Sequence, residues 1–393
     1  MSRWIWPATL TALALAVVLP SPAGWGLAIG LLLLSLGSTA WAAVLRRRVQ
    51  VEVVLPARLI RGEHAELTVV ATNRSRLPAT RVRVEVQLPP GGLSPSSLSF
   101  ELAVPARSTV RRGAPVTAFN RGRWEPVPRP ALVGDPFGIH EIATRRPPTA
   151  APVVVLPDVL PVRRIHLPAA SPLAEVPDRR SLLTDPTAIV GVRPYAPGDP
   201  LRAIHWPATA ATGTLVRRET ERAWARDLLV VVDLDHDGWE RHDHAPEVGI
   251  VVAASLLADA LLRLRQPAGL LTSWVDRVGE EPRATAFRIA GARPHLDAML
   301  THLAVAKLHP GIPLPDLVGR DVRRHQPGTT VAVVTGRPGR HLADALRPLR
   351  RNGLAPVVVH VAPDQVLRAE VPPTGGCPRI PVASDVPLSR LTL

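Results

Sequence analysis

The sequence predicts three structural parts: an N-terminal transmembrane helical hairpin, an all-β sandwich-like domain and a C-terminal α/β doubly wound domain. The first part is almost uncharged, the second alternates apolar and polar residues between turn signals, and the third alternates apolar runs with helical patterns. At 393 residues the chain is long enough for two or three domains. We expect the parts to cover residues 1–48, 49–150 and 225–393, with an irregular linker at 151–224 that is rich in Pro, Arg and Ser.

Two apolar segments near the N-terminus are predicted to cross a membrane. Trp4–Leu19 is apolar apart from threonines and one proline, and Trp25–Leu45 carries no charge. At roughly 1.5 Å per residue, the second segment is long enough for a hydrocarbon core of about 30 Å. Tryptophans stand near the segment ends, where indole rings favour the membrane interface. These are Trp4, Trp6, Trp25 and Trp41.

Positive charges outside the hairpin predict its orientation. Arg3 precedes the first segment and Arg46–Arg48 follows the second, whereas the connecting residues carry no charge. The positive-inside rule then places both ends, and the domains that follow, on the cytoplasmic side of the inner or plasma membrane. A cleaved signal peptide is the alternative, and the three arginines directly after the second segment argue against export. Cys377 is the lone cysteine, so no disulfide can form within the chain.

The charge balance is strongly basic. The formal net charge is +14, and Lys307 is the only lysine, so arginine carries nearly all of the positive charge. Such a balance favours anionic lipid or acidic partner surfaces, and it is also found in nucleic-acid-binding proteins. No basic stripe alternates with aromatic residues, and no zinc-finger or basic-zipper pattern occurs. We therefore expect membrane lipid, and no nucleic acid, among the partners.

The second part reads as a series of antiparallel strands. Turn residues separate apolar–polar alternations at a spacing typical of a β-sandwich. An interaction module and a spacer are both compatible with this pattern. Asp135-Pro136-Phe137-Gly138 near its end has turn chemistry, and we expect Phe137 to plug a core edge. The expected strands are 49–56, 64–73, 80–89, 98–105 and 108–119.

The third part alternates buried strands with helices. Asp227–Leu234 is a continuous apolar run, as expected for a strand covered on both faces. Alternating strands and helices imply a parallel, doubly wound sheet, whose ligand crevice lies beyond the carboxyl ends of its strands. The other expected strands are 268–275, 284–289, 329–334 and 356–361, and the expected helices are 246–265, 294–307, 315–325 and 340–352.

Three aspartates follow the first strand of this sheet. Asp233, Asp235 and Asp237 stand at alternate positions, so in an extended chain they share a face and can converge on a hard cation such as Mg²⁺. The same run partly matches the calcium-loop pattern, but His244 stands where that loop needs its closing glutamate. A polar strand end with a turn or capping aspartate is the alternative interpretation.

Val190–Glu221 is a dense polar and aromatic segment that no single periodicity explains. His205 is a candidate catalytic base, but no nucleophile or acid accompanies it at a fixed spacing, and the common hydrolase and nucleotide-binding motifs do not occur. A hydrogen-bonded and ion-paired lock between this segment and the sheet domain is the favoured interpretation, and a surface that contacts a partner is the second. The residues that we expect to carry binding are Arg193, Tyr195, Gly198, Asp199, Arg202, His205, Trp206, Glu219 and Glu221.

This segment resembles the signature of the bacterial family called domain of unknown function 58. The order Pro197-Gly198-Asp199, then Ile204-His205-Trp206, then Glu219 and Glu221 carries the resemblance, and the domain order of the whole chain is similar to that of the family. The resemblance implies that the α/β part is a von Willebrand factor A-like domain. In such domains Asp-x-Ser-x-Ser after the first strand helps to coordinate magnesium. Here aspartates replace both serines, and Thr335-Gly336 stands where a later aspartate is expected.

The resemblance also implies a role without catalysis. Members of the family are often encoded beside MoxR-type AAA+ ATPases and are thought to act with them in assembling or maturing other proteins. We therefore expect a membrane-anchored cytoplasmic scaffold or adaptor that is not an enzyme, with Mg²⁺ as a possible cofactor at the aspartates. The alternatives are a hydrolase that uses His205 or the cluster Asp233, Asp235 and Asp237, and an exported adhesive protein.

Overall fold

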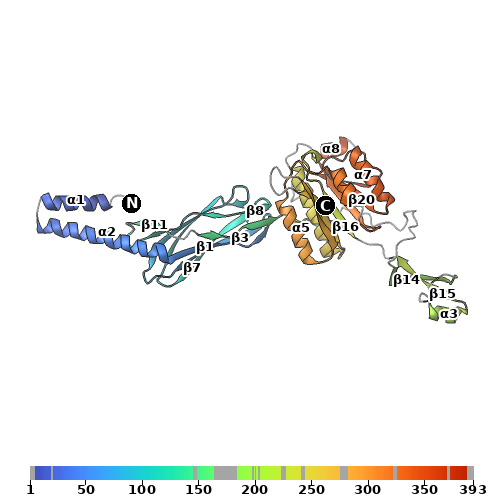
Figure 1. The fold of residues 1–393 in the computed structure, drawn as a ribbon, viewed down its shortest axis with the longest axis horizontal. Coiled ribbons are helices and arrows are strands. Elements are labelled where there is room, and N and C mark those ends of the chain that lie inside the picture. The colour runs from blue at the N-terminus through green and yellow to red at the C-terminus, as the bar shows by residue number, and fades with distance from the viewer. Residues whose placement is uncertain are drawn as a thin grey trace. The chain divides into compact units, whose positions relative to one another are not determined.

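The structure, a computed structural model, forms two compact units. One unit contains residues 1–158 and 300–305, and the other contains residues 159–299 and 306–393 (Figure 1). The structure describes residues 5–18, 21–144, 148–162, 184–196, 199, 201, 204–222, 227–239, 244–274, 282–321, 325–369 and 372–386.

Two antiparallel helices begin the chain (Figure 1). Helix α1 spans Ile5–Val18 and helix α2 spans Pro22–Arg48. The Ser21 side chain accepts the Gly24 amide at 3.0 Å and caps α2, and Pro22 has the fixed φ that suits a first helical turn. Helix α2 therefore starts closer to α1 than the apolar pattern alone indicated.

Two helices in the described part of the chain are long and apolar enough to cross a membrane. They are α2 and the helix Ala245–Arg263, and the second is mostly buried within the protein. Helix α1 has the same apolar character but is shorter. The helix Ala245–Arg263 is therefore explained as a core helix, and α2 is the candidate span that the sequence also predicted, whereas α1 is apolar but shorter.

Strands follow α2 directly and form two five-stranded sheets that are antiparallel, as predicted, except that β12 pairs parallel with β1. One sheet has the order β12-β1-β3-β7-β5 and the other contains β11-β10-β4-β6, with β9 beside β4. Alternate side chains of the long strands are buried, and they form one shared core with the end of α2. The strands are β1 (Val49–Val54), β3 (His64–Asn73), β4 (Ala79–Gln87), β5 (Leu93–Ser94), β6 (Ser97–Val104), β7 (Thr109–Ala118), β9 (Val127–Pro128), β10 (Leu132–Gly134), β11 (Glu141–Ala143) and β12 (Thr149–Ala150).

A third, smaller sheet extends this β-rich unit past residue 150. Strand β13 (Val153–Leu156) pairs parallel with β2 (Arg58–Ile60) and antiparallel with β8 (Gly122–Trp124). The β-rich unit therefore runs to Asp158 in the structure. Pairing with strands far away in the sequence sets this boundary.

The C-terminal sheet has six strands in the order β18-β17-β16-β19-β20-β21. All neighbours pair parallel except β18, which is antiparallel to β17. The strands and helices found here match the predicted segments, and α8 and β21 were not predicted. Their bounds are β16 (Leu228–Val232), α4 (Ala245–Ala258), β17 (Ala268–Trp274), β18 (Arg283–Ala290), α5 (Arg293–Val305), α6 (Leu314–Asp321), β19 (Thr330–Thr335), α7 (Arg340–Arg351), β20 (Ala355–Ala362), α8 (Asp364–Ala369) and β21 (Arg379–Ala383).

Both faces of the central strands are buried, which explains their continuous apolar sequence. Leu229 and Val231 belong to a core that includes residues of α6 and α7, such as Leu317 and Leu346. The alternate side chain Val230 is also fully buried, and α4 contacts β16, β19 and β20. A π-helical turn, η3 (Asp259–Arg263), continues α4.

The linker expected at 151–224 contains strands and a helix as well as irregular segments where the structure describes it. Strand β14 (Thr184–Pro194) pairs antiparallel with β15 (Val216–Arg222), and the short helix α3 (Trp206–Thr212) lies between them in the sequence. Two register shifts interrupt the pairing of β14, so an apolar–polar alternation is not maintained along it. This hairpin contains the signature segment.

Candidate functional site

A pocket of about 470 Å³ lies at the carboxyl ends of the central parallel strands. Strands β16 and β19 are neighbours with Val232 opposite Val334, so the loops that follow them meet at the same edge. The β16 loop contributes Asp233, Asp235 and Asp237, and the β19 loop contributes Arg337. The crevice predicted from the strand pattern therefore exists, and the predicted aspartates line it.

Helices α6 and α7 supply the rest of the polar lining. Asp316 lies in the first turn of α6, and His341 and Asp344 lie near the beginning of α7. Asp344 also forms an ion pair with Arg347, with 2.9 Å between its carboxylate oxygen and a guanidinium nitrogen. Carboxylates thus outnumber the cationic groups of the lining, and the pocket favours a positively charged ligand group.

Asp233 is the most buried of these carboxylates, with 3% of its surface exposed. One carboxylate oxygen accepts the Thr335 hydroxyl at 2.8 Å, and the other accepts the Asp235 amide at 3.1 Å. The Trp239 indole donates to the Asp233 main-chain carbonyl at 3.0 Å. A Cβ atom on Gly238 would lie 2.0 Å from the Asp233 carboxylate, so the loop needs glycine at that position.

Burial changes the acidity of Asp233. Loss of hydration raises its pKa to about 6, against hydrogen bonds from Thr335 and the Asp235 amide that act to lower it. The nearby charge of Asp235 adds to the rise. A carboxylate with this pKa is partly protonated at neutral pH and gains from the approach of a cation.

The three aspartates do not converge as a metal site. Among the described residues, no group of three or more His, Cys, Asp or Glu side chains is placed to hold a metal ion. The Asp233 oxygens accept protein donors, and Asp235 accepts the Asp237 amide at the start of a 3₁₀ turn, η2 (His236–Gly238). This arrangement does not fit the set of oxygen ligands that Mg²⁺ requires, and no role is assigned to a metal.

The signature segment folds around a second aspartate. Asp199 pairs with Arg193 at 2.8 Å and also with Arg217, and it accepts the Ala196 amide at 3.1 Å. The Ala196 amide is the main cause that holds the pKa of Asp199 below its usual value, and the two arginines add to it. Tyr195 donates its hydroxyl to the Asp199 carbonyl at 3.0 Å. These contacts lock β14 to β15.

His205 has a structural contact in this hairpin. Its Nδ1 atom accepts the Ala208 amide at 3.0 Å and caps helix α3, and its own amide donates to the Val216 carbonyl at 2.8 Å. Trp206, by contrast, is 62% exposed. We expected these side chains to lock the segment to the sheet domain. The contacts that they form in the structure instead join β14, α3 and β15 of the hairpin to one another.

The remaining predicted signature residues are Gly198, Arg202, Glu219 and Glu221. Gly198 and Arg202 lie outside the described residues. Glu219 and Glu221 lie on β15, and Glu219 pairs with Gly191 of β14. The side chains of both glutamates lie outside the described residues. The hairpin and the acidic pocket are separate groups of residues in the structure.

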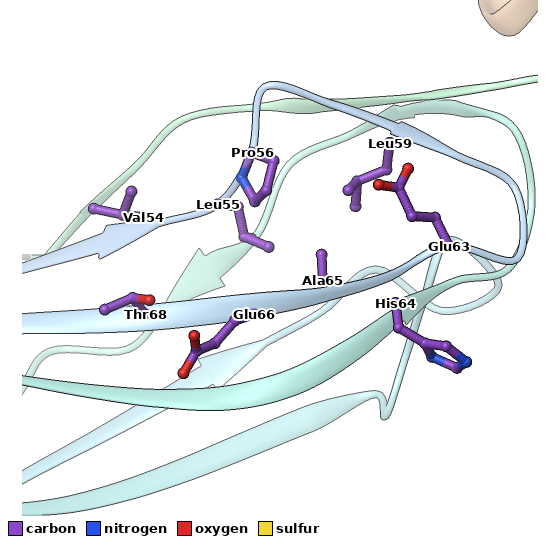
Figure 2. Close-up of a pocket in the computed structure, with 9 residues that line it drawn as sticks. All are labelled: Val54, Leu55, Pro56, Leu59, Glu63, His64, Ala65, Glu66 and Thr68. Atoms are coloured by element: carbon purple, nitrogen blue, oxygen red, sulfur yellow. The ribbon is translucent and has the colours of Figure 1, made fainter.

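A second pocket, of about 490 Å³, lies in the β-rich unit (Figure 2). Strand β1 pairs with β3 up to Val54 opposite Thr68. In the same register Pro56 would face Glu66, and proline has no amide to donate, so the two chains separate at this point. Leu55 and Ala65 lie on opposite sides of the gap (Figure 2).

One protein-family model matches part of the chain. Residues 191–361 match the family described as "Protein of unknown function DUF58". The matched range begins in β14 and ends in β20, so it contains both the signature hairpin and the acidic pocket. It supports the family resemblance that the signature residues carried. A comparison with curated proteins found no match.

Solved structures are similar to part of the chain only at a low level. A CARDB domain from Pyrococcus furiosus is 16% identical, covers 27% of this chain and 91% of its own, and has a TM-score of 0.22. A cohesin module from a Clostridium perfringens family 33 glycoside hydrolase is 8% identical, covers 28% of this chain and 97% of its own, and has a TM-score of 0.24. Likenesses at this level define neither fold nor function.

Proposed function

We propose that the protein is a membrane-anchored cytoplasmic scaffold or adaptor that binds a protein partner in the acidic pocket. The single observation that carries the proposal is the position of the pocket, at the carboxyl ends of β16 and β19, with Asp233 buried at its base. Doubly wound sheets bind their ligands at this edge. The α/β part would be a von Willebrand factor A-like domain in which contacts with the partner replace the magnesium bridge.

The charges of the pocket indicate which group the partner inserts. Asp237 and Asp316 both line the pocket and are exposed, so a guanidinium or ammonium group that enters it can meet carboxylates from the β16 loop and from helix α6. The family resemblance makes a MoxR-type AAA+ ATPase the proposed partner, in the assembly or maturation of other proteins. A basic side chain of that ATPase would fill the pocket.

A non-catalytic role suits the contacts of the predicted catalytic candidates. A hydrolase needs a nucleophile in contact with a base. His205 uses Nδ1 to cap α3, and the Asp233 oxygens accept hydrogen bonds from Thr335 and the Asp235 amide. These groups are therefore explained by local structure and by the shape of the pocket.

Co-purification from native membranes tests the proposal. The full chain should recover an AAA+ ATPase, and Asp237→Lys should lose it because the reversed charge repels the basic group of the partner. Asp364→Lys is the matched control, since Asp364 lies on α8 outside the pocket and forms an exposed ion pair with Arg368. Recovery of the same proteins with wild type and Asp237→Lys would count against docking in the pocket.

A further inference from the structure

Helix α2 is divided between two environments. Its C-terminal turns belong to the β-rich unit: Leu45 is fully buried in that core, and the Trp41 ring packs against it and donates to the Pro78 carbonyl at 3.2 Å. Leu27, Ile29 and Leu33 in its first half are well exposed. Trp41, which the sequence placed at the membrane interface, is therefore a contact of the β-rich unit.

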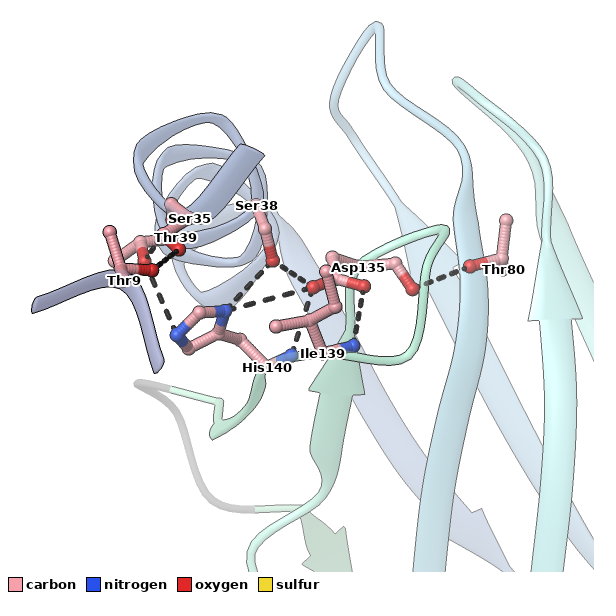
Figure 3. Close-up of polar contacts among 8 residues, drawn as sticks. All are labelled: Thr9, Ser35, Ser38, Thr39, Thr80, Asp135, Ile139 and His140. Atoms are coloured by element: carbon pink, nitrogen blue, oxygen red, sulfur yellow. Dashed lines mark hydrogen bonds and ion pairs between the residues drawn. The ribbon is translucent and has the colours of Figure 1, made fainter. Parts of the chain in front are cut away.

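A buried polar cluster marks the change between these environments (Figure 3). Ser38 on α2 donates to the Asp135 carboxylate and contacts His140 Nδ1 at 2.8 Å. The Thr39 hydroxyl lies 3.5 Å from the other ring nitrogen of His140. Asp135 and His140 come from the connection between β10 and β11, so a loop of the β-rich unit reaches α2 at Ser38.

This cluster is incompatible with the middle of a bilayer. Asp135 is 1% exposed, and burial acts to raise its pKa, but hydrogen bonds from Ser38, His140 and Ile139 outweigh it and lower the pKa. The carboxylate is thus ionised at neutral pH, and an ionised group in hydrocarbon is costly. The cluster therefore favours a hydrocarbon region that ends before Ser38.

Helix α1 gives an independent marker of the same level. Trp6, near its first residue, contacts His140 edge-on with ring centroids 6.4 Å apart. The Thr9 hydroxyl lies 3.0 Å from that of Ser35 on α2. Because tryptophan favours the membrane interface, Trp6 at the end of α1 places the interface beside Ser38 and His140.

Phe137 is a second exposed aromatic side chain close to the polar cluster, in addition to Trp6. Phe137 is 68% exposed in the Asp135–Gly138 turn, although we expected it to plug a core edge. That expectation is wrong because the Asp135 carboxylate, which accepts the Ile139 and His140 amides at 3.0 and 2.9 Å, occupies the inside of the turn. Phe137 is left on the outside of the turn, two residues from Asp135 in the sequence.

We propose that the bilayer surface crosses α2 at Ser38 and that Phe137 enters the lipid interface there. The occupant of this exposed site is the bilayer itself, because the site is continuous with the two apolar helices. Pro22–Gly37 measures about 24 Å and α1 about 21 Å at roughly 1.5 Å per residue. Both are shorter than a hydrocarbon core of about 30 Å, so the bilayer thins around the hairpin. The inference rests on the proposed membrane anchor and refines where it ends.

Single-cysteine labelling of the full chain tests this boundary. In a Cys377→Ser background, an environment-sensitive fluorophore is attached to Leu33→Cys, Val44→Cys or Phe137→Cys, and the chain is reconstituted into phosphatidylcholine vesicles with brominated acyl chains. The three native side chains are exposed, at 65, 43 and 68%. Phe119→Cys is the matched control, because Phe119 is 61% exposed. It follows the end of β7 that pairs with His64, and His64 is the end of β3 most distant from α2.

The expected result is loss of most fluorescence at position 33, partial loss at 137 and no loss at 44 or 119. Quenching at both 33 and 44 would leave the anchor intact and overturn the boundary at Ser38. Quenching at 33 without any at 137 would overturn the insertion of Phe137. No quenching at 33 would overturn the membrane anchor of the proposed function, and this inference with it.

Discussion

The structure predicts in most detail how Asp233→Asn changes the free energy of unfolding. The pKa of Asp233 is raised from 3.8 to about 6 in the folded chain. Each pKa unit corresponds to about 1.4 kcal/mol, so ionised Asp233 lowers the free energy of unfolding at pH 7 by about 3 kcal/mol relative to the protonated form. Asparagine removes this penalty. It also removes one acceptor for Thr335 or the Asp235 amide, at about 1 kcal/mol.

The net expectation is that Asp233→Asn stabilises the α/β unit by about 2 kcal/mol at pH 7. The sign follows from the protons bound. Between about pH 4 and 6 the folded state binds more protons at Asp233 than the unfolded state does, so this contribution is full below pH 4 and is lost as pH rises through 6. The advantage of the variant should therefore be largest above pH 6 and should turn into a deficit of up to about 1 kcal/mol below pH 4, where the cost of the lost hydrogen bond remains.

Hydrogen exchange of peptides from β16 and β19 measures this free energy in the full chain in detergent, because these buried strands report the opening of the sheet. Asp237→Asn is the control, and since Asp237 is exposed we expect a change within about 0.5 kcal/mol. The reasoning is refuted if Asp233→Asn lowers protection at pH 7, or if the wild-type stability of these strands rises between pH 4 and 6. The stabilised variant should also bind its partner more weakly.

Three further predictions concern the neighbouring contacts. Gly238→Ala should destabilise the α/β unit by about 1–3 kcal/mol in denaturant titrations, because its Cβ meets the buried Asp233 carboxylate; an unchanged midpoint would contradict the close approach. Asp199→Ala should release β14 from β15, with faster exchange of the Tyr195 amide and an unchanged melting temperature of the six-stranded sheet; full protection would show that the ion pairs are not needed. Asp135→Asn should cost about 2–3 kcal/mol at pH 7 in detergent-solubilised protein. Because the folded pKa of Asp135 is lowered from 3.8, the wild-type advantage should shrink as pH falls below 3.8 and through the folded pKa, and a deficit that does not change over this range would exclude the charge as its cause.

The sequence predicted the elements whose patterns are local. His64–Asn73 alternates apolar and polar residues and is strand β3 from end to end, and Asp227–Leu234 is apolar throughout and contains the central strand β16. These patterns record burial of one face or of both. Strand β14 escaped prediction because two register shifts break its alternation, and β13 joined the β-rich unit through pairing with distant strands.

The candidate site was predictable only in part. Asp233, Asp235 and Asp237 follow a strand, so the sheet topology places them at the ligand-binding edge. Asp316 and His341 come from helices that pack beside that edge, and helix packing is not encoded at a fixed spacing. The Asp-Pro-Phe-Gly motif signalled a turn, but the carboxylate that fills that turn depends on α2, far away in the sequence.

Photo-crosslinking from the pocket in intact cells tests the central claim most directly. A photoreactive residue replaces Asp237 at the pocket mouth, and the same residue at Asp364 on α8 is the control. The account predicts that position 237 captures an AAA+ ATPase, identified by mass spectrometry, and that position 364 does not. Capture of no protein from position 237, or of the same proteins from both positions, would contradict partner docking at the carboxyl ends of the sheet.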